Sequence, residues 1–425
     1  MSNYLNKTDE IVENKVKENK KKNRNEKGFD LAKQIRTLYI TGVLGNLSLT
    51  GAWVVILAAR GFSLVEIGFA ETLFHITSLI CEIPSGMLAD IYGRKKMLAL
   101  GNIMAIAGDL VMFFSTDFWL VALSMPFHAM AYNFASGSGE ALAYDSMKLE
   151  GAEAGYEKYN SNQSIIYRIA TGVSTLMAGL ALYLGYKTSY LISALMGSLT
   201  LFFTLKLVEV RCQDNETSNA VVEKTFDKTK KTSYDKDEDC SFGNDADTNG
   251  VVSIKTLLSE LVQFFKDSIL FLVHNSKAAK LMFLNSFVGA IDILLLFFLQ
   301  SKLRDAGSSN WILGPALFVM ELGGVAGAKL IVKAKNVKYY KIFIICTMGV
   351  LAGVLLEHTS VVWIMVLGGF ISSMADDAIE IRTNTKLQDM FPSEQRATLI
   401  SISSFTFSVI MMVLSPLAGY FFSIW

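Results

Sequence analysis

Several acidic residues stand inside long apolar stretches of this 425-residue sequence, among them Asp109, Glu140, Asp292, Glu321 and Asp376. A charged side chain at membrane depth costs about 2.5 to 3.5 kcal/mol on insertion scales, so it usually faces a water-filled cavity or a partner. A carboxylate that is protonated when dry and ionised when wet can couple proton binding to a change of conformation. These five positions therefore predict proton coupling or contact with a substrate.

A simpler interpretation of such an acid is one half of a structural ion pair. Arg168 lies in a similar apolar stretch, and it is the expected partner of Asp145 or Glu140. A pair of this kind removes an isolated buried charge without any role in transport. For Arg168 and Asp145 the structural pair is the interpretation that we favour.

Other polar residues in the apolar stretches allow similar alternatives. Asp376 and Glu380 are four residues apart on one helix face and Arg382 follows, so this trio is expected to form a contact at the inner membrane surface. His75 and His128 are lone histidines that can titrate near neutral pH. Most aromatic residues here are expected to pack or to face lipid, but some could line a cavity for a lipophilic solute.

Residues for covalent chemistry do not accompany these charges. The sequence contains no Ser/His/Asp grouping at the ends of its apolar stretches and no Gly-x-x-x-x-Gly-Lys-Ser/Thr loop for nucleotides. Residues 245–250 copy the first half of a calcium-binding loop, but Thr256 stands where that loop needs a bidentate Glu. We therefore expect no enzymatic activity, no cofactor and no metal.

The apolar stretches are long enough to cross a membrane. Hydrophobic residues make up 52% of the chain and charged residues 18%, and the mean hydropathy is +0.37, above that of soluble proteins. Because the stretches are continuously apolar rather than alternating, they predict helices and not barrel strands. Eleven spans are expected, at 37–59, 65–89, 97–114, 118–144, 163–184, 188–207, 279–300, 311–332, 341–357, 361–381 and 397–423.

Lysine and arginine in the connecting segments predict the orientation, because positive residues stay on the cytoplasmic side. Ten of them precede residue 37, and alternation of the spans places twelve more in short inner loops against four in outer loops. The N-terminus is therefore expected in the cytoplasm, in a multi-pass protein of a bacterial plasma membrane. The 39 basic and 39 acidic residues balance, which argues against a nucleic-acid partner.

Composition divides the chain into two apolar parts and two polar ones. In the polar part that separates the spans, residues 208–250 are expected to be largely disordered, and the amphipathic stretch 252–274 is expected to lie along the inner membrane face. The expected segments are a charged cytosolic tail at 1–36, a six-helix bundle at 37–207, a cytosolic linker at 208–275 and a second bundle at 276–425.

A charged loop after the second expected span carries the most specific pattern. Residues 86–95 read Gly-Met-Leu-Ala-Asp-Ile-Tyr-Gly-Arg-Lys. This resembles the hallmark of the major facilitator superfamily, Gly-x-Leu-Ala-Asp-Arg-x-Gly-Arg-Lys, and departs from it at Ile91. Glu82 and Pro84, together with residues 136–145, resemble bacterial drug exporters of the tetracycline and multidrug type.

The residue types in this loop support a conformational role. Gly86 and Gly93 permit tight turns and close helix approach, while Asp90, Arg94 and Lys95 place opposite charges at a cytosolic helix end. We expect a breakable latch in which Asp90 lies near the positive N-terminus of the eleventh span. The resemblance implies that this loop holds the two bundles together when the protein opens outward.

The resemblance also implies an all-α membrane fold of two pseudo-symmetric bundles around a midplane cavity that opens to each side in turn. The expected function is proton-coupled efflux of small lipophilic or cationic compounds by a monomer. One alternative is uptake of a small nutrient such as a sugar, peptide or organic acid. Another is a non-transporting or decayed homologue, because the family pattern has twelve spans and this chain ends after the eleventh, at Trp425.

Overall fold

The computed structural model describes most of the two apolar parts of the chain. The expected tail, the calcium-loop-like stretch at 245–256 and most of the amphipathic stretch at 252–274 lie outside the described residues, although 269–274 are helical. The described residues are 29–213, 239–242, 269–307, 309–334, 336–390 and 396–424, with isolated positions at 259, 262, 263 and 266.

The N-terminal half is helical, and its helices begin where side chains satisfy free backbone N–H groups. Ser63 and Glu66 form a capping box at the start of α4, and the Asp117 carboxylate accepts from the backbone N–H of Leu120 at 3.1 Å at the start of α6. The helices are α2 (Leu31–Asn46), α3 (Trp53–Ala59), α4 (Leu64–Tyr92), α5 (Arg94–Phe114), α6 (Phe118–Ala135), α7 (Ser138–Leu149), the 3₁₀ turn η1 (Glu153–Gly155), α8 (Tyr156–Leu176), α9 (Ala178–Leu184) and α10 (Tyr186–Leu205).

The C-terminal half consists of long helices, each of which covers one expected span. Gly307 has a φ of +84° in the turn between the first two, a conformation that glycine adopts without strain. Pro315 and Pro416 lie inside α14 and α17. The helices are α13 (Ser276–Asp305), α14 (Asn310–Lys333), α15 (Tyr339–Glu357), α16 (Val362–Met390) and α17 (Arg396–Ile424).

Three of the expected spans are broken rather than continuous. The run 37–59 becomes α2 and α3, the run 118–144 breaks at Gly137, where φ is +71°, and the run 163–184 becomes α8 and α9, which meet at 46°. By length and hydropathy, eight of the described helices can each cross a membrane, or up to nine spans if that bent pair counts as one. The count of eleven spans stays a prediction.

Part of the linker is folded, and the expectation of disorder from residue 208 was wrong there. β1 (Val210–Gln213) pairs antiparallel with β2 (Asp239–Phe242). Val210 is fully buried in an apolar cluster with Leu38, Leu142 and Tyr159. Because the segment is polar overall, its composition did not indicate that Val210 is buried. This contact extends the N-terminal half beyond α10.

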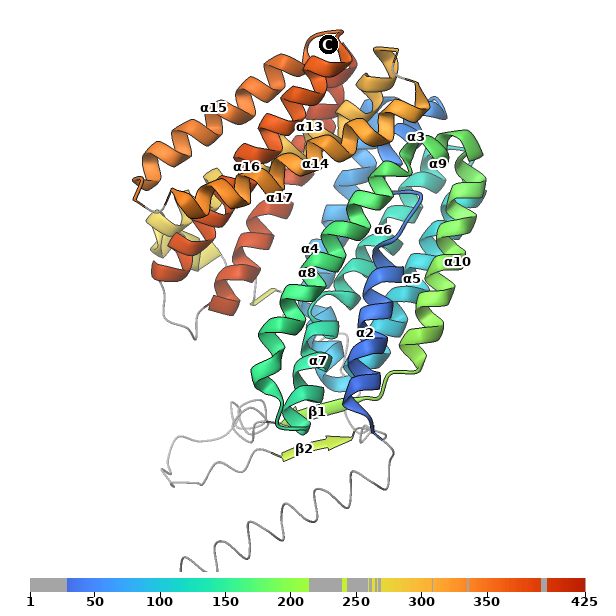
Figure 1. Cartoon of the computed structure of the whole chain (residues 1–425), viewed down its shortest axis with the longest axis vertical. Helices are drawn as coiled ribbons and strands as arrows, with labels where there is room; N and C mark the ends of the chain where they lie inside the picture. The colour runs from blue at the N-terminus through green and yellow to red at the C-terminus, as the bar shows by residue number, and fades with distance from the viewer. Residues whose placement is uncertain are drawn as a thin grey trace, which may run out of the picture.

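The two halves touch at one end and separate at the other (Figure 1). At the end that carries α3 and α9, four glycines bring backbones together across the boundary: Gly68 packs against Ser415, Gly419 against Leu64, Gly179 against Asn310 and Gly314 against Leu176. One apolar cluster includes Leu57 and Met112 of the first half with Leu294 and Phe298 of the second. We call this contact the glycine seam.

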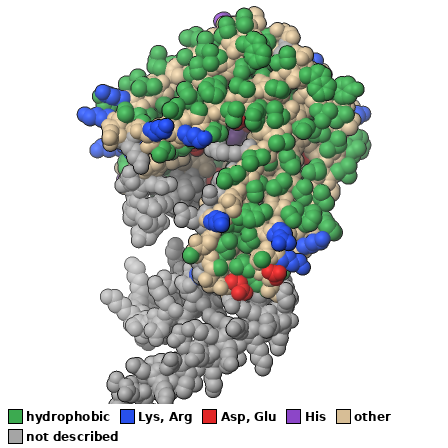
Figure 2. All heavy atoms as spheres, viewed as in Figure 1, with side chains coloured by type: hydrophobic (Ala, Val, Ile, Leu, Met, Phe, Trp, Pro, Cys, Tyr) green, Lys and Arg blue, Asp and Glu red, His purple; other side chains and the backbone are tan. Residues whose placement is uncertain are grey.

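The outer surface is that of a membrane protein. Figure 2 shows hydrophobic side chains over the flanks of both halves, with lysine and arginine toward the edges. Trp119, Tyr183 and Trp363 are each at least 70% exposed. Such large apolar area on the flanks is what contact with lipid requires.

Candidate functional site

A cavity of about 1070 Å³ lies between the two halves. It runs from Thr50 and Trp53 near the glycine seam to Gly86 and Asn384 near the separated end. Among the other residues that line it are Glu71, Phe74, His75, Ser78, Glu82, His128, Tyr132, Asn133, Tyr167 and Tyr190 of the N-terminal half, and Asn285, Ser286, Phe297, Asp376, Glu380, Ser403, Ser404, Phe407 and Ser408 of the C-terminal half.

The cavity wall is acidic. Four carboxylates line it, from Glu71 and Glu82 on α4 and from Asp376 and Glu380 on α16. Among the described lining residues there is no lysine or arginine, and two histidines are the only basic side chains. Low-dielectric walls with charges of one sign focus their field into the space between them, so these carboxylates, when ionised, would favour a cation.

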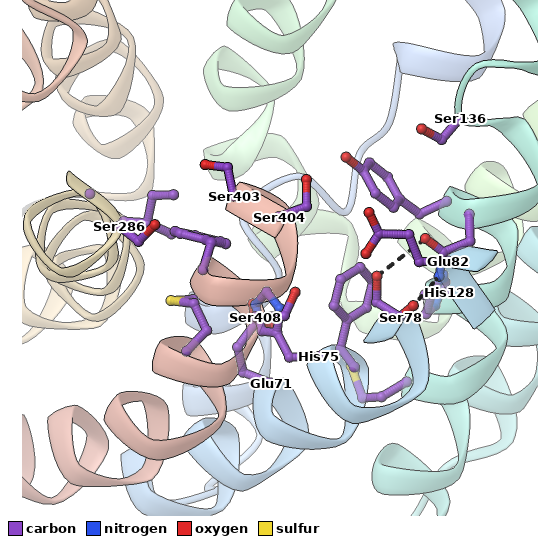
Figure 3. Close-up of a pocket in the computed structure, with 18 of the residues that line it drawn as sticks. Glu71, His75, Ser78, Glu82, His128, Ser136, Ser286, Ser403, Ser404 and Ser408 are labelled. Atoms are coloured by element: carbon purple, nitrogen blue, oxygen red, sulfur yellow. Dashed lines mark hydrogen bonds and ion pairs between the residues drawn. The ribbon is translucent and has the colours of Figure 1, made fainter. Parts of the chain in front are cut away.

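Aromatic and hydroxyl groups make up much of the remaining wall. The ring of Trp53 meets that of Phe297 across the boundary between the halves, edge to face, with centroids 5.9 Å apart. Phe74 and Tyr132 lie 6.4 Å apart on the N-terminal side. Opposite them, α17 presents a series of serines, which Figure 3 shows with α4. Aromatic faces suit lipophilic and cationic groups.

Glu71 and His75 form an acid–histidine pair on one face of α4. His75 Nε2 lies 3.3 Å from Glu71 Oε1, and the side chains are 9% and 12% exposed. The other ring nitrogen, Nδ1, is buried without a hydrogen-bond partner among the described atoms. The ring packs against Phe407 of the other half, and Figure 3 shows Ser408 beside the pair. The pair therefore lies at the boundary between the two halves.

Asp109 and His128 form a second pair, one layer behind the wall. Asp109 is 7% exposed on α5, and its Oδ1 lies 4.0 Å from Nε2 of His128. Gly108 leaves room for the imidazole, because a Cβ there would lie 3.0 Å from it. His128 lines the cavity and so connects the buried acid Asp109 with the solvent in it.

Glu82 also lines the cavity, on the part of α4 that Pro84 disturbs. Proline has no backbone N–H, so Pro84 leaves the carbonyl of Ile80 without its helical donor. The Ser85 hydroxyl donates to the carbonyl of Glu82 at 2.8 Å. Figure 3 shows Glu82 on the same side of the cavity as Ser78 and His128.

The charged loop contacts its own half of the protein. Gly93 has a φ of +109° between α4 and α5. The Glu209 carboxylate accepts from the backbone N–H groups of Arg94 and Lys95 at 2.9 and 2.8 Å, and the Arg94 guanidinium pairs with Asp145. Arg94 also donates to the carbonyl of Ala141 at 3.0 Å. These contacts fix α5 to α7 and to the segment after α10.

The surroundings of Gly86 differ from the close helix packing that was expected there. A Cβ at Gly86 would meet no atom within 4 Å, because α4 faces the cavity at that point. The side chains of Asp90 and Arg168, and the start of α17 at residues 391–395, lie outside the described part of the structure. The latch through Asp90 and the pair of Arg168 with Asp145 therefore stay predictions.

The remaining expected acids are spread over both halves. Glu140 is exposed in the first turn of α7, and Glu321 is exposed on α14. Asp292 is 4% exposed inside the C-terminal half and does not belong to the cavity lining. Asp376 lines the cavity, and its carboxylate oxygen lies within 4.8 Å of those of Asp377 and Glu380.

Sequence reasoning missed three acids that the structure makes prominent. Glu71 is four residues before His75, a spacing that could have indicated the pair. Glu209 was assigned to a disordered linker, and no local pattern marks it as a helix cap. Glu357 ends an apolar stretch and looks like a boundary residue, yet it is 7% exposed.

Comparison with known proteins agrees with the architecture. The Major Facilitator Superfamily model matches residues 38–416. A putative sugar transporter of Arabidopsis thaliana, ERD6-like 13, is 33% identical over 81 residues, which are 19% of this chain and only 17% of that protein.

Solved structures with the same fold are transporters of different solutes. The nucleoside transporter NupG is 16% identical with a TM-score of 0.63, covering 92% of this chain and 91% of that one. A D-xylose–proton symporter is 10% identical with a TM-score of 0.62, covering 91% and 89%. A bacterial homologue of the human lysosomal transporter Spinster, solved inward-facing and unoccupied, is 14% identical with a TM-score of 0.63, covering 91% and 81%.

At these identities the likeness to solved structures shows the fold alone. The family match, in contrast, extends over most of the chain, from the middle of α2 to the last third of α17. The chain therefore belongs to the major facilitator superfamily and is a multi-pass membrane transporter.

Proposed function

We propose that this transporter exports small lipophilic or cationic compounds in exchange for protons. The observation that carries the proposal is the wall of the cavity, where four carboxylates and several aromatic rings face a space whose described lining contains no lysine or arginine. A cation gains from the field of the acids and from the aromatic faces. An organic acid would meet repulsion in the same place.

Glu82 is the acid that we assign to the bound cation. It lies near the separated end of the cavity, beside Tyr132 and Asn133. If that end faces the cytoplasm, as the positive loops predict, the described conformation is open to the inside. A cytoplasmic solute then reaches Glu82 before it meets the glycine seam.

The two acid–histidine pairs are the groups that we assign to proton coupling. Protonation of the pair at Asp109 and His128 removes negative charge from behind the wall, and protonation of the pair at Glu71 and His75 adds positive charge at the boundary. Either event weakens the hold on a cation and favours its release. Glu140, Asp292, Glu321 and Asp376 remain candidates for the same role.

Cell-based transport tests the proposal. In a pump-deficient bacterium, expression should lower the accumulation of cationic dyes such as ethidium, and a proton uncoupler should abolish the difference. Glu82→Gln should reduce the effect at least tenfold, whereas Glu66→Gln, an acid in the first turn of α4 and outside the cavity lining, should not. Unchanged accumulation over a broad panel of cations would reject export.

One observation favours a second candidate, uptake of a neutral nutrient such as a sugar or nucleoside. Ser403, Ser404 and Ser408 of α17 face the cavity together with Asn285 and Asn133, and hydroxyl and amide groups suit a polyhydroxylated solute. Solute accumulation above the control strain would favour this candidate. Absence of any transported solute would favour the non-transporting homologue.

A further inference from the structure

The C-terminal half contains a group of buried polar side chains that the cavity does not explain. Asp292 of α13, Glu357 of α15 and Ser372 of α16 are 4%, 7% and 0% exposed. None of the three belongs to the described lining of the cavity. We call these residues the inner acid group.

The members of this group face one another from three helices. The carboxylates of Glu357 and Asp292 interact electrostatically, and Asp292 also faces the hydroxyl of Ser372. Two glycines bring α15 and α16 close enough for this, because Gly368 packs against the Glu357 side chain and Gly353 against that of Ser372. The three side chains therefore converge on one interior point.

Both carboxylate oxygen atoms of Glu357 are buried without a hydrogen-bond partner among the described atoms, and the Ser372 hydroxyl is the polar group that faces Asp292. The charged groups that act on Asp292 from α14 and α16, Glu321 and Asp377, are acidic as well. Burying an ionised carboxylate costs several kcal/mol unless a cation or hydrogen-bond donors compensate it. A cation bound among these oxygen atoms would compensate the ionised carboxylates, whereas protonation would neutralise them.

We propose that the inner acid group binds a hard divalent metal cation of the calcium type. The donors are all oxygen atoms and carry two negative charges, which is the ligand set that such ions prefer. Calcium tolerates irregular geometry and protein-only ligands better than magnesium, which keeps its water. Glu357 is the last residue of α15, so the ion has a short path from the membrane surface.

The bound ion ties α13, α15 and α16 together without entering the substrate cavity. It is a structural ion of the C-terminal half: Asp292 would serve it in place of proton coupling, and the cavity acids of the proposed export are not involved. A ligand that binds only the folded protein raises its stability in proportion to the logarithm of its concentration above Kd. Thermal unfolding therefore reads out the site without any transport assay.

The test uses the purified full chain in detergent after treatment with EDTA. Calcium chloride should raise Tm by several degrees in a saturable way, and sodium, potassium and choline chlorides should not. Glu357→Gln and Asp292→Asn should each remove the calcium-dependent shift. Two matched controls should keep it: Asp109→Asn, a buried acid of the other half, and Glu380→Gln, an acid of the nearby group at Asp376 and Asp377.

Several results would overturn the proposal. One is the absence of a calcium-dependent shift up to about 10 mM, well above the Kd of weak calcium sites at ~1 mM. Another is a shift that survives Glu357→Gln, or one that Glu380→Gln removes instead, which would place the ion in the cavity. Stability that depends on pH but on no metal would assign protons to the group. If Glu357→Gln does not fold, Ser372→Ala and equilibrium dialysis of ⁴⁵Ca²⁺ on the unchanged chain decide the question.

Discussion

The two halves share an architecture of long helices but treat their buried acids differently. In the N-terminal half, Asp109 and Glu71 each face a histidine, and Asp145 faces Arg94. In the C-terminal half, the carboxylates of Asp292 and Glu357 have oxygen atoms without a described hydrogen-bond partner. These three acids thus have basic partners within their own half, whereas no described basic side chain pairs with Asp292 or Glu357.

This difference supports the separate tasks that we propose for the two halves. Each acid–histidine pair near the cavity places two proton-binding side chains side by side, which suits the proposed coupling. Buried carboxylates without a basic partner, such as those of Asp292 and Glu357, stay ionised only when a cation compensates their charge, which suits the proposed ion binding.

The largest loss of stability is expected when the ion pair of Arg94 and Asp145 in the first half is broken. Arg94→Ala removes a partner of the buried Asp145 carboxylate, and loss of one member of a buried pair costs about 3 to 5 kcal/mol. The unfolding midpoint in detergent should fall strongly, whereas Lys96→Ala, in the same helix turn and exposed, should change it little. Equal midpoints for the two variants would contradict this view of the first half.

A slightly smaller effect is expected at the glycine seam, where the halves meet. In Gly314→Ala the new methyl group would overlap the backbone at Leu176, and overpacking of this kind costs about 1 to 3 kcal/mol. Because the overlap exists only when the seam is closed, the variant should also shift cysteine-accessibility labelling toward an open seam. Gly45→Ala, whose nearest atom is a methyl group at 3.7 Å, provides the control. An unchanged labelling pattern would show that the seam tolerates side chains.

In the second half, neutralising a buried acid in the absence of metal is expected to leave the stability unchanged or to raise it, in contrast to the first half. Glu357→Gln replaces a buried carboxylate by a neutral group of the same shape, so in EDTA it should leave stability unchanged or raise it by about 1 kcal/mol. Asp109→Asn should lower stability, because it takes away the acid that faces His128. Urea titration of both variants measures the contrast. A clear loss for Glu357→Gln in EDTA would mean that Glu357 is compensated within the chain.

The smallest effect is a change in substrate affinity, and its size distinguishes the two candidate classes of substrate. Ser408→Ala removes one hydroxyl from the C-terminal wall. For a lipophilic cation the affinity should change by less than about threefold, because such a solute does not need that hydrogen bond. For a sugar or nucleoside the loss should exceed about tenfold. Competition binding on the purified protein distinguishes the two.

The sequence predicted the fold well because membrane insertion imposes simple rules. Each apolar run became a helix or a pair of helices, and the loop at 86–95 indicated the family that the match over 38–416 confirms. The breaks within the runs were harder to predict. Gly137 takes φ of +71°, and nothing in its neighbourhood distinguishes it from glycines that stay helical.

The site was predictable only where spacing carried information. Asp376 was a candidate because it is an acid within an apolar stretch, and Glu82 was singled out by the resemblance to drug exporters; both line the cavity. Glu71 was overlooked, although its distance from His75 is that of helical neighbours. Glu357 depends on contacts with α13 and α16, which are distant in sequence, so no local pattern could have shown its burial.

The preference of the cavity for positive charge is the central claim, and a pair of ions with matched shape tests it most directly. Tetraphenylphosphonium and tetraphenylborate have nearly the same size and opposite charge, and Trp53 in the cavity wall reports their binding by fluorescence quenching, with Trp53→Phe as the blank. Tetraphenylphosphonium should bind at least tenfold more tightly, and Glu82→Gln should reduce that preference. Equal affinity for the two ions, or tighter binding of tetraphenylborate, would contradict the account.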